Sequence, residues 1–118
     1  MFNIIFDFDG VIHSYTSRWI DEATVPDPPV PGAIEFIREV MKEYGVVICS
    51  TRAKSPVGIS AIHDYLIKYG MSEEEVSKIQ ITNKKVAAIL QIDDRSFCFK
   101  GNFPSLDYIK NFKPWNKE

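Results

Sequence analysis

The 118 residues, 45% of them hydrophobic, predict a single domain, 1–118, with its own core and no room for a second. The formal net charge of -2 excludes the overall basic field that dominates non-specific nucleic-acid binding, so contacts with phosphate must be local. No apolar run approaches membrane-spanning length, and the amino end lacks the basic start of a signal peptide, so we expect no membrane association and a reducing, cytoplasmic location.

The first predicted element is a buried strand over residues 3–8, because this short apolar run stops at the turn sequence Asp9-Gly10. Residues 11–31 are expected to form an irregular loop, since four prolines between positions 26 and 31 oppose a long helix. This loop is too short for a separate cap domain, so the site should be open. A helix is predicted over residues 31–44, where apolar residues recur on one face.

The alternation of strand and helix continues along the second half of the chain. A second strand is predicted over residues 46–49, followed by an amphipathic helix that ends at Gly70. A short helix should begin at Ser72, because three acidic residues follow it in the first turn. The remaining predictions are strands at 79–82 and 89–92, a weak edge strand at 97–99, a helix at 104–112, and a tail, 113–118, that packs through Trp115.

This order of elements predicts an α/β fold. We expect a three-layer sandwich in which helices cover both faces of a central, mostly parallel sheet. In sheets of this kind the ligand site lies beyond the carboxyl ends of the strands. The residues that follow each strand are therefore the candidates for chemistry.

Polar residues of complementary kinds follow four of the predicted strands. Parallel strands would bring these side chains together, and carboxylates gathered there would repel one another unless a divalent cation neutralised them. An all-oxygen ligand set without His or Cys favours Mg²⁺. Such a cluster suits phosphoryl transfer, in which a carboxylate attacks phosphorus. The residues are Asp7 and Asp9 at the carboxyl end of the first strand, Ser50 at the end of the second, Lys85 just after the third, and Asp93 with Asp94 at the end of the fourth.

The segments FDFDGVIHS, ICSTR, TNKK and IDDR resemble, in this order, the four motifs of the haloacid dehalogenase superfamily of phosphatases. The resemblance implies a Rossmann-like fold of the small type with a minimal cap or none. It also implies that Asp7 is the nucleophile and Asp9 the general acid and base. The magnesium ion of the family would be bound by Asp7, the backbone carbonyl of Asp9 and an acidic residue of the last motif.

Two of the implied roles fall on adjacent residues. The acidic metal ligand of the last motif is Asp93, with Asp94 as a direct or water-mediated ligand, and the sequence does not separate the pair. Ser50 matches the hydroxyl residue that binds phosphate in the second motif. Thr51 is the alternative to Ser50.

The basic residues are assigned with more alternatives. Lys85 has the spacing of the family's phosphate-binding lysine, but Val86 stands where the family usually has proline, so Lys84 is an alternative. Arg52 and Arg95 would either help to hold the substrate or cap strand ends.

The cysteines and histidines indicate no site. Cys49 and Cys98 form no Cys-x-x-Cys motif, so both are expected to be small apolar core residues. The histidines have no third partner for a metal site or a triad. His13 should be at most a flap residue near the entrance, and His63 a helix-surface residue.

The predicted function is hydrolysis of phosphomonoesters through an aspartyl-phosphate on Asp7, with Asp9 as acid and base and Mg²⁺ as cofactor. An open site would admit phosphates on bulky substrates, including nucleotide or polynucleotide ends, and Trp19 would either stack on a base or sugar or close the core edge. No stable protein partner is predicted. The alternatives are a receiver-like phosphoacceptor domain, which the order of the motifs opposes, and a catalytically silent binding module of the same fold.

Overall fold

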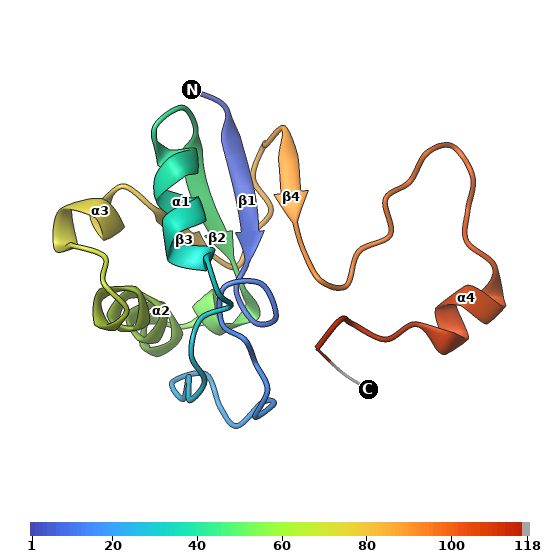
Figure 1. Ribbon diagram of the computed structural model, residues 1–118, viewed down its shortest axis with the longest axis horizontal. Coiled ribbons are helices and arrows are strands. Elements are labelled where there is room, and N and C mark those ends of the chain that lie inside the picture. Colours follow the sequence, from blue (N-terminus) through green and yellow to red (C-terminus); the bar gives the residue numbers. More distant parts are fainter. Residues whose placement is uncertain (117–118) are drawn as a thin grey trace.

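The computed structural model describes residues 1–116 and contains a four-stranded parallel sheet flanked by helices (Figure 1). The strands lie in the order β3 (Gln80–Thr82), β2 (Gly45–Cys49), β1 (Asn3–Asp7) and β4 (Leu90–Ile92). Because Asp7 pairs with Cys49 and Cys49 with Thr82, the strands end at a common edge. The predicted α/β class and parallel sheet are confirmed.

Within residues 1–116, five helical segments accompany the sheet. They are α1 (Ala33–Met41), the 3-10 turn η1 (Thr51–Lys54), α2 (Pro56–Lys68), α3 (Glu73–Ser77) and α4 (Leu106–Asn111). Ser72 caps α3, as predicted, by accepting a hydrogen bond from the Glu75 N–H while the Glu75 side chain accepts one from the Ser72 N–H. No helix among residues 1–116 is long and apolar enough to cross a membrane.

The core lies between one face of the sheet and the helices. Right-handed crossovers from β1 to β2 and from β2 to β3 run in one direction, so α1 and α2 fall on the same face. There Ile4 and Ile48 pack with Ile37 of α1 and Ile62 of α2, all of them buried. Burial of each such side chain stabilises the fold by about 1.5–3 kcal/mol.

The return from β3 to β4 crosses the opposite face, where Ile5 is buried. Residues 83–89 make this crossing without a helix. Asn3 joins it to the sheet, because its side chain donates to the Ala87 carbonyl at 3.2 Å and its own carbonyl accepts from the Ile89 N–H at 3.0 Å. The second helical layer predicted from the sequence is therefore reduced here to an extended connection.

The chain beyond β4, residues 95–116, forms what we call the C-terminal arm. It leaves the sheet after β4 and returns toward the loop that follows β1 (Figure 1). Its end is fastened there, since Trp115 Nε1 donates to the Gly10 carbonyl at 2.7 Å and Asn116 Nδ2 to the Ser14 carbonyl at 2.9 Å. Trp115 contacts the fold through this hydrogen bond but is 63% exposed, and Asn116 contacts it as well, so the tail does not pack through Trp115 alone. Residues 117–118 of the predicted tail lie outside the described residues.

Two expectations about residues 97–99 are wrong. This segment forms no strand, because β propensity expresses packing on a pleated surface and the arm runs away from the sheet. Cys98 is exposed for the same reason and is not a core residue. Cys49, at the end of β2, is half-buried.

Candidate functional site

A hollow of about 420 Å³ lies at the carboxyl ends of the strands. This is the place where an open parallel sheet binds its ligands, because the loops that leave the strands diverge there. Five residues predicted for the site line it, and one of them is Thr51, the alternative to Ser50. The lining residues are Asp7, Asp9, Tyr15, Trp19, Cys49, Ser50, Thr51, Asn83, Gln91, Asp93 and Arg95.

Three carboxylates gather at this edge. Asp7 ends β1, and Asp93 and Asp94 follow β4, whose Ile92 pairs with Phe6 in the neighbouring strand. Each offers a carboxylate oxygen, and these atoms lie within 4.8 Å of one another. The register of β1 against β4 therefore assembles residues that are more than 80 positions apart in the sequence.

The environment of Asp7 favours a proton or a cation. Burial raises the pKa of Asp7 to about 8, helped by a hydrogen bond with Asp94 and by the charges of Asp93 and Asp94. The N–H of Phe8 donates to Asp7 Oδ1 at 2.9 Å and opposes this rise. A metal ion would replace the proton, because a divalent charge removes the repulsion between the carboxylates.

The residues around this cluster fit such an ion. Asp94 Oδ1 is buried, and it has no hydrogen-bond partner among the described residues. This oxygen is therefore available as a ligand to a cation. Asp93 is held by the Arg95 N–H at 2.8 Å and by Gln91 Nε2 at 3.2 Å. Gly10 has φ +90°, and a Cβ there would lie 2.2 Å from Asp94 Oδ2. Oxygen donors of this kind suit a hard cation such as Mg²⁺.

The Asp9 carboxylate faces a different set of partners. Arg52 donates from Nε to Asp9 Oδ2 at 2.8 Å and from Nη2 to Oδ1 at 3.1 Å, and His13 Nδ1 lies 2.7 Å from Oδ1. His13 Nε2 accepts the Asp27 N–H at 3.1 Å, which assigns the imidazole proton to Nδ1, facing Asp9. Although burial raises the pKa of Asp9, the hydrogen bonds from His13 and Arg52 bring it below its usual value. Asp9 is therefore ionised at neutral pH.

His13 differs from its prediction. The side chain is fully buried between Asp9 and Asp27, not near the entrance of the flap. The reason is a tight turn after β1, in which the Phe8 carbonyl accepts the N–H groups of Ile12 and His13, both at 2.9 Å. This turn directs the imidazole back toward Asp9. His63 lies on the surface of α2, as predicted, with its side chain 36% exposed.

Arg52 joins the loop to the site. Its guanidinium is fully buried, and Nη1 donates to the carbonyls of Asp21, Glu22 and Thr24 at 2.8, 3.0 and 3.0 Å. The Trp19 ring lies over it, with the guanidinium carbon 4.7 Å from the ring centroid. Arg52 thus fixes the position of Asp9 and of the loop through one planar group. Trp19 both packs on Arg52 and lines the hollow.

Ser50 directly follows β2 and lines the hollow. It is buried, and its Oγ accepts the Arg52 N–H at 3.1 Å, so its hydroxyl proton is directed elsewhere and can be donated to a ligand oxygen. Thr51 lines the same hollow and is exposed. The structure therefore brings both hydroxyl candidates to the site.

The lysine predicted for the site lies elsewhere. Lys85 is exposed and lines a separate hollow with Ile5 and Ile89, because residues 83–89 cross the second face of the sheet. Lys84 is exposed as well. The residue that reaches the site from this segment is Asn83, directly after β3, and the sequence signal for it was its position at a strand end.

Three more residues that line the hollow differ from the predicted set. The sequence predicted no site role for Gln91 and Tyr15, and it left two alternatives for Arg95. Gln91 lies within β4 and holds Asp93, and Tyr15 belongs to the loop and has φ +62°. Arg95, for which substrate binding was one of two alternatives, lines the hollow with its cationic side chain. An alternating strand pattern could have placed Gln91, but the loop conformation at Tyr15 leaves no sequence signal.

The assembled site combines a carboxylate cluster that suits a divalent cation, an ionised aspartate held by a buried arginine, and hydroxyl and cationic side chains that suit phosphate. Comparison with protein-family models found no match, and searches of curated proteins and of solved structures found none either. The site geometry is therefore the basis for assigning a function.

Proposed function

We propose that this chain is a Mg²⁺-dependent phosphomonoester hydrolase of the haloacid dehalogenase type, with a Rossmann-like fold and a loop in place of a cap. The observation that carries the proposal is the gathering of Asp7, Asp93 and Asp94 beside the hollow that Asp7, Asp93 and Ser50 line. These three carboxylates would hold the ion. Bound Mg²⁺ would supply positive charge against the oxygens of the phosphoryl group.

Asp7 acts as the nucleophile in this scheme. One oxygen of its carboxylate would bind the ion while the other attacks phosphorus and forms an aspartyl-phosphate as the bond to the leaving oxygen breaks. The Ser50 hydroxyl donates to a phosphate oxygen, and Arg95 neutralises charge in the role predicted for Lys85. Water then attacks the same phosphorus, releasing inorganic phosphate and restoring Asp7.

Asp9 serves both halves of the cycle, but its surroundings favour one of them. Since its pKa is held below the usual value, Asp9 is in the ionised form that can accept a proton from the attacking water, although the same shift makes it a weaker base. Protonating the leaving oxygen requires Asp9 to gain a proton first. Esters with acidic leaving groups, such as aryl phosphates, should therefore react faster than alkyl phosphates.

A second candidate function is a phosphate-binding module without turnover. The observation that favours it is the position of Lys85 outside the hollow, since a phosphatase of this type needs cationic charge at the transferring group. The receiver-like alternative is opposed by the order of the acidic motifs along the chain.

Phosphate release from an aryl phosphate, with Mg²⁺ and with a chelator, tests the proposal. We expect release only with Mg²⁺, loss of activity in Asp7→Asn and Asp9→Asn, and no change in Asp64→Asn, an exposed aspartate of α2. Acid-quenched wild type should contain phosphorylated Asp7. Release that needs no metal, or full activity of Asp7→Asn, would refute the mechanism, whereas phosphate binding without release would indicate the silent module.

The substrate and the cellular location are further proposals. Phosphorylated nucleotides or polynucleotide ends suit a site without a cap domain, because the loop at residues 11–31 is too short to enclose the substrate. A cytoplasmic location remains a prediction from the sequence.

A further inference from the structure

The C-terminal arm exposes an unusual amount of apolar surface. None of the residues of α4 is buried, and no residue of the arm belongs to the hydrophobic core. Where exposed apolar side chains lie together in a patch, they mark an interaction site. The exposed large apolar residues of the arm are Phe97, Phe99, Phe103, Leu106, Tyr108, Ile109, Phe112 and Trp115.

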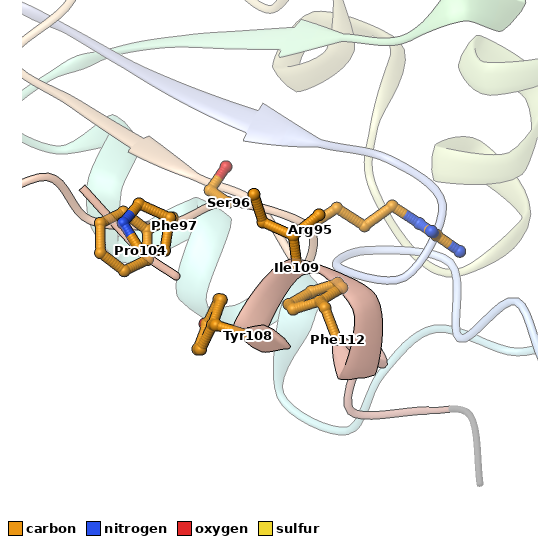
Figure 2. Close-up of a pocket in the computed structure, with 7 residues that line it drawn as sticks. All are labelled: Arg95, Ser96, Phe97, Pro104, Tyr108, Ile109 and Phe112. Carbon is orange, nitrogen blue, oxygen red and sulfur yellow. The ribbon is translucent and has the colours of Figure 1, made fainter. Parts of the chain in front are cut away.

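Part of this surface forms a hollow of about 220 Å³ (Figure 2). Tyr108 of α4 and Phe112, directly after α4, line it on one side, and Arg95 and Phe97 line it from the segment after β4. The ring centroids of Phe97 and Tyr108 are 5.5 Å apart and those of Tyr108 and Phe112 are 6.3 Å apart. The hollow is smaller than the roughly 300–1,000 Å³ of ordinary ligand pockets, so it suits a single planar group.

Arg95 connects this hollow with the carboxylate site. It is among the lining residues of both hollows, and its N–H donates to Asp93 Oδ1 at 2.8 Å. In Figure 2 its guanidinium extends away from the rings of the arm. The far end of the arm is also fastened beside the site, through Trp115 and the Gly10 carbonyl. A ligand with a phosphate at the carboxylates and a planar group in the hollow of the arm would contact Arg95 in both places.

The charges of the arm indicate which ligand this is. Arg95, Lys100, Lys110 and Lys113 are basic and Asp107 is acidic, although the whole chain has a net charge of -2. Aromatic faces interleaved with cations are the means by which proteins bind single-stranded nucleic acid. Lys110 and Lys113 are exposed and stand on either side of Phe112 in the sequence, so cations accompany the aromatic residues of the hollow.

We propose that the hollow of the arm binds the terminal base of a single-stranded nucleic acid whose terminal phosphate occupies the carboxylate site. This inference rests on the proposed function for the position of the phosphate. It assigns Tyr108 and Phe112 to stacking and Arg95 to the link between base and phosphate.

Binding of a fluorescent thymidine decamer tests the inference without requiring turnover. The decamer carries a phosphate at its 5′ or its 3′ end, and anisotropy is measured with the Asp7→Asn variant and Mg²⁺. Adding Tyr108→Ala or Phe112→Ala should weaken binding about 5- to 150-fold, the range for loss of one stacked base. Tyr108→Phe, which keeps the ring, should bind as before. Leu106→Ala is the matched control, because Leu106 is 83% exposed on the same helix and does not line the hollow.

The ligand provides a second control. A decamer whose phosphorylated terminal nucleotide lacks its base should bind as weakly as the intact decamer binds to the Tyr108→Ala variant. Tyr108→Ala should cause no further loss of affinity for the decamer that lacks this base. Equal binding of both strands, or equal effects of Tyr108→Ala and Leu106→Ala, would overturn the proposal. Thymidine monophosphate should bind more weakly than the decamer, and equal affinity would overturn the assignment to a strand.

Two further measurements separate this inference from its alternatives. Hydrolysis of glycerol phosphate, which has no base, should be unchanged by Tyr108→Ala in the otherwise wild-type chain. If the wild type hydrolyses no phosphomonoester while Tyr108→Ala still weakens strand binding, the proposed function fails and base binding stands. Sedimentation tests whether a second copy of this chain covers the hollow of the arm. The proposal would be overturned if the chain forms a dimer that Tyr108→Ala dissociates while strand binding is unchanged.

Discussion

Replacing Arg52 by methionine removes a buried side chain that holds Asp9 and the loop at once. Methionine has a similar length and keeps much of the packing, but it leaves Asp9 with His13 alone and removes the shared donor of the carbonyls of Asp21, Glu22 and Thr24. Removing one partner of a buried ion pair costs about 3–5 kcal/mol. Asp9 is 16% exposed and keeps the His13 bond, so we expect the lower part of this range.

The loss should be visible in thermal and urea unfolding followed by circular dichroism. For a chain of 118 residues, 1 kcal/mol corresponds to about 4 °C in Tm, so Arg52→Met should unfold about 12 °C or more below the wild type. Lys54→Met is the matched control. Lys54 is 60% exposed and its ion pair with Glu22 spans 3.4 Å, so its loss should cost about 0–1 kcal/mol.

A double-mutant cycle identifies the cause of the loss. Adding Asp9→Asn to Arg52→Met removes the uncompensated charge, so the double variant should be less destabilised than the sum of the single variants by about 0.5–3 kcal/mol. Additive losses would show that Arg52 does not act through Asp9. A loss no larger than that of Lys54→Met would refute the reasoning altogether.

Three further outcomes are expected. Gly10→Ala should lose more stability than Gly32→Ala, because both glycines have positive φ but only the Cβ at position 10 would meet Asp94, and equal losses in urea unfolding would contradict this clash. Mg²⁺ at about 100 times its Kd should raise the free energy of unfolding by about 2.7 kcal/mol, and Asp94→Asn should reduce this gain in a thermal-shift titration, whereas an unchanged gain would place the ion elsewhere. The hydrogen bond from Arg38 lowers the pKa of Glu75 from 4.5 to about 2, so Glu75 stabilises the fold above pH 4.5 and this contribution is lost as the pH falls toward 2. The stability difference between wild type and Glu75→Gln should therefore shrink over that interval, and a constant difference would argue against the ion pair.

The sequence alone determined the features that depend on local patterns. Short apolar runs predicted the four strands, and the residues directly after them predicted that Asp7, Ser50 and Asp93 would meet at one edge of a parallel sheet. The Ser72 cap was predictable for the same reason, because capping involves residues only three positions apart. Such signals are local, and sheet topology converts them into a shared site.

The tertiary structure alone decided the features that depend on how distant segments cross. Arg52 contacts Asp9 across 43 positions, and no periodicity records that pairing. Lys85 was placed by spacing, but the connection from β3 to β4 crosses the opposite face and takes it away from the strand ends. The aromatic residues at 97–99 have strand propensity, yet no strand lies beside them, so they stay on the exposed arm. Propensity and spacing describe what a segment can do, and the neighbours that the fold supplies decide what it does.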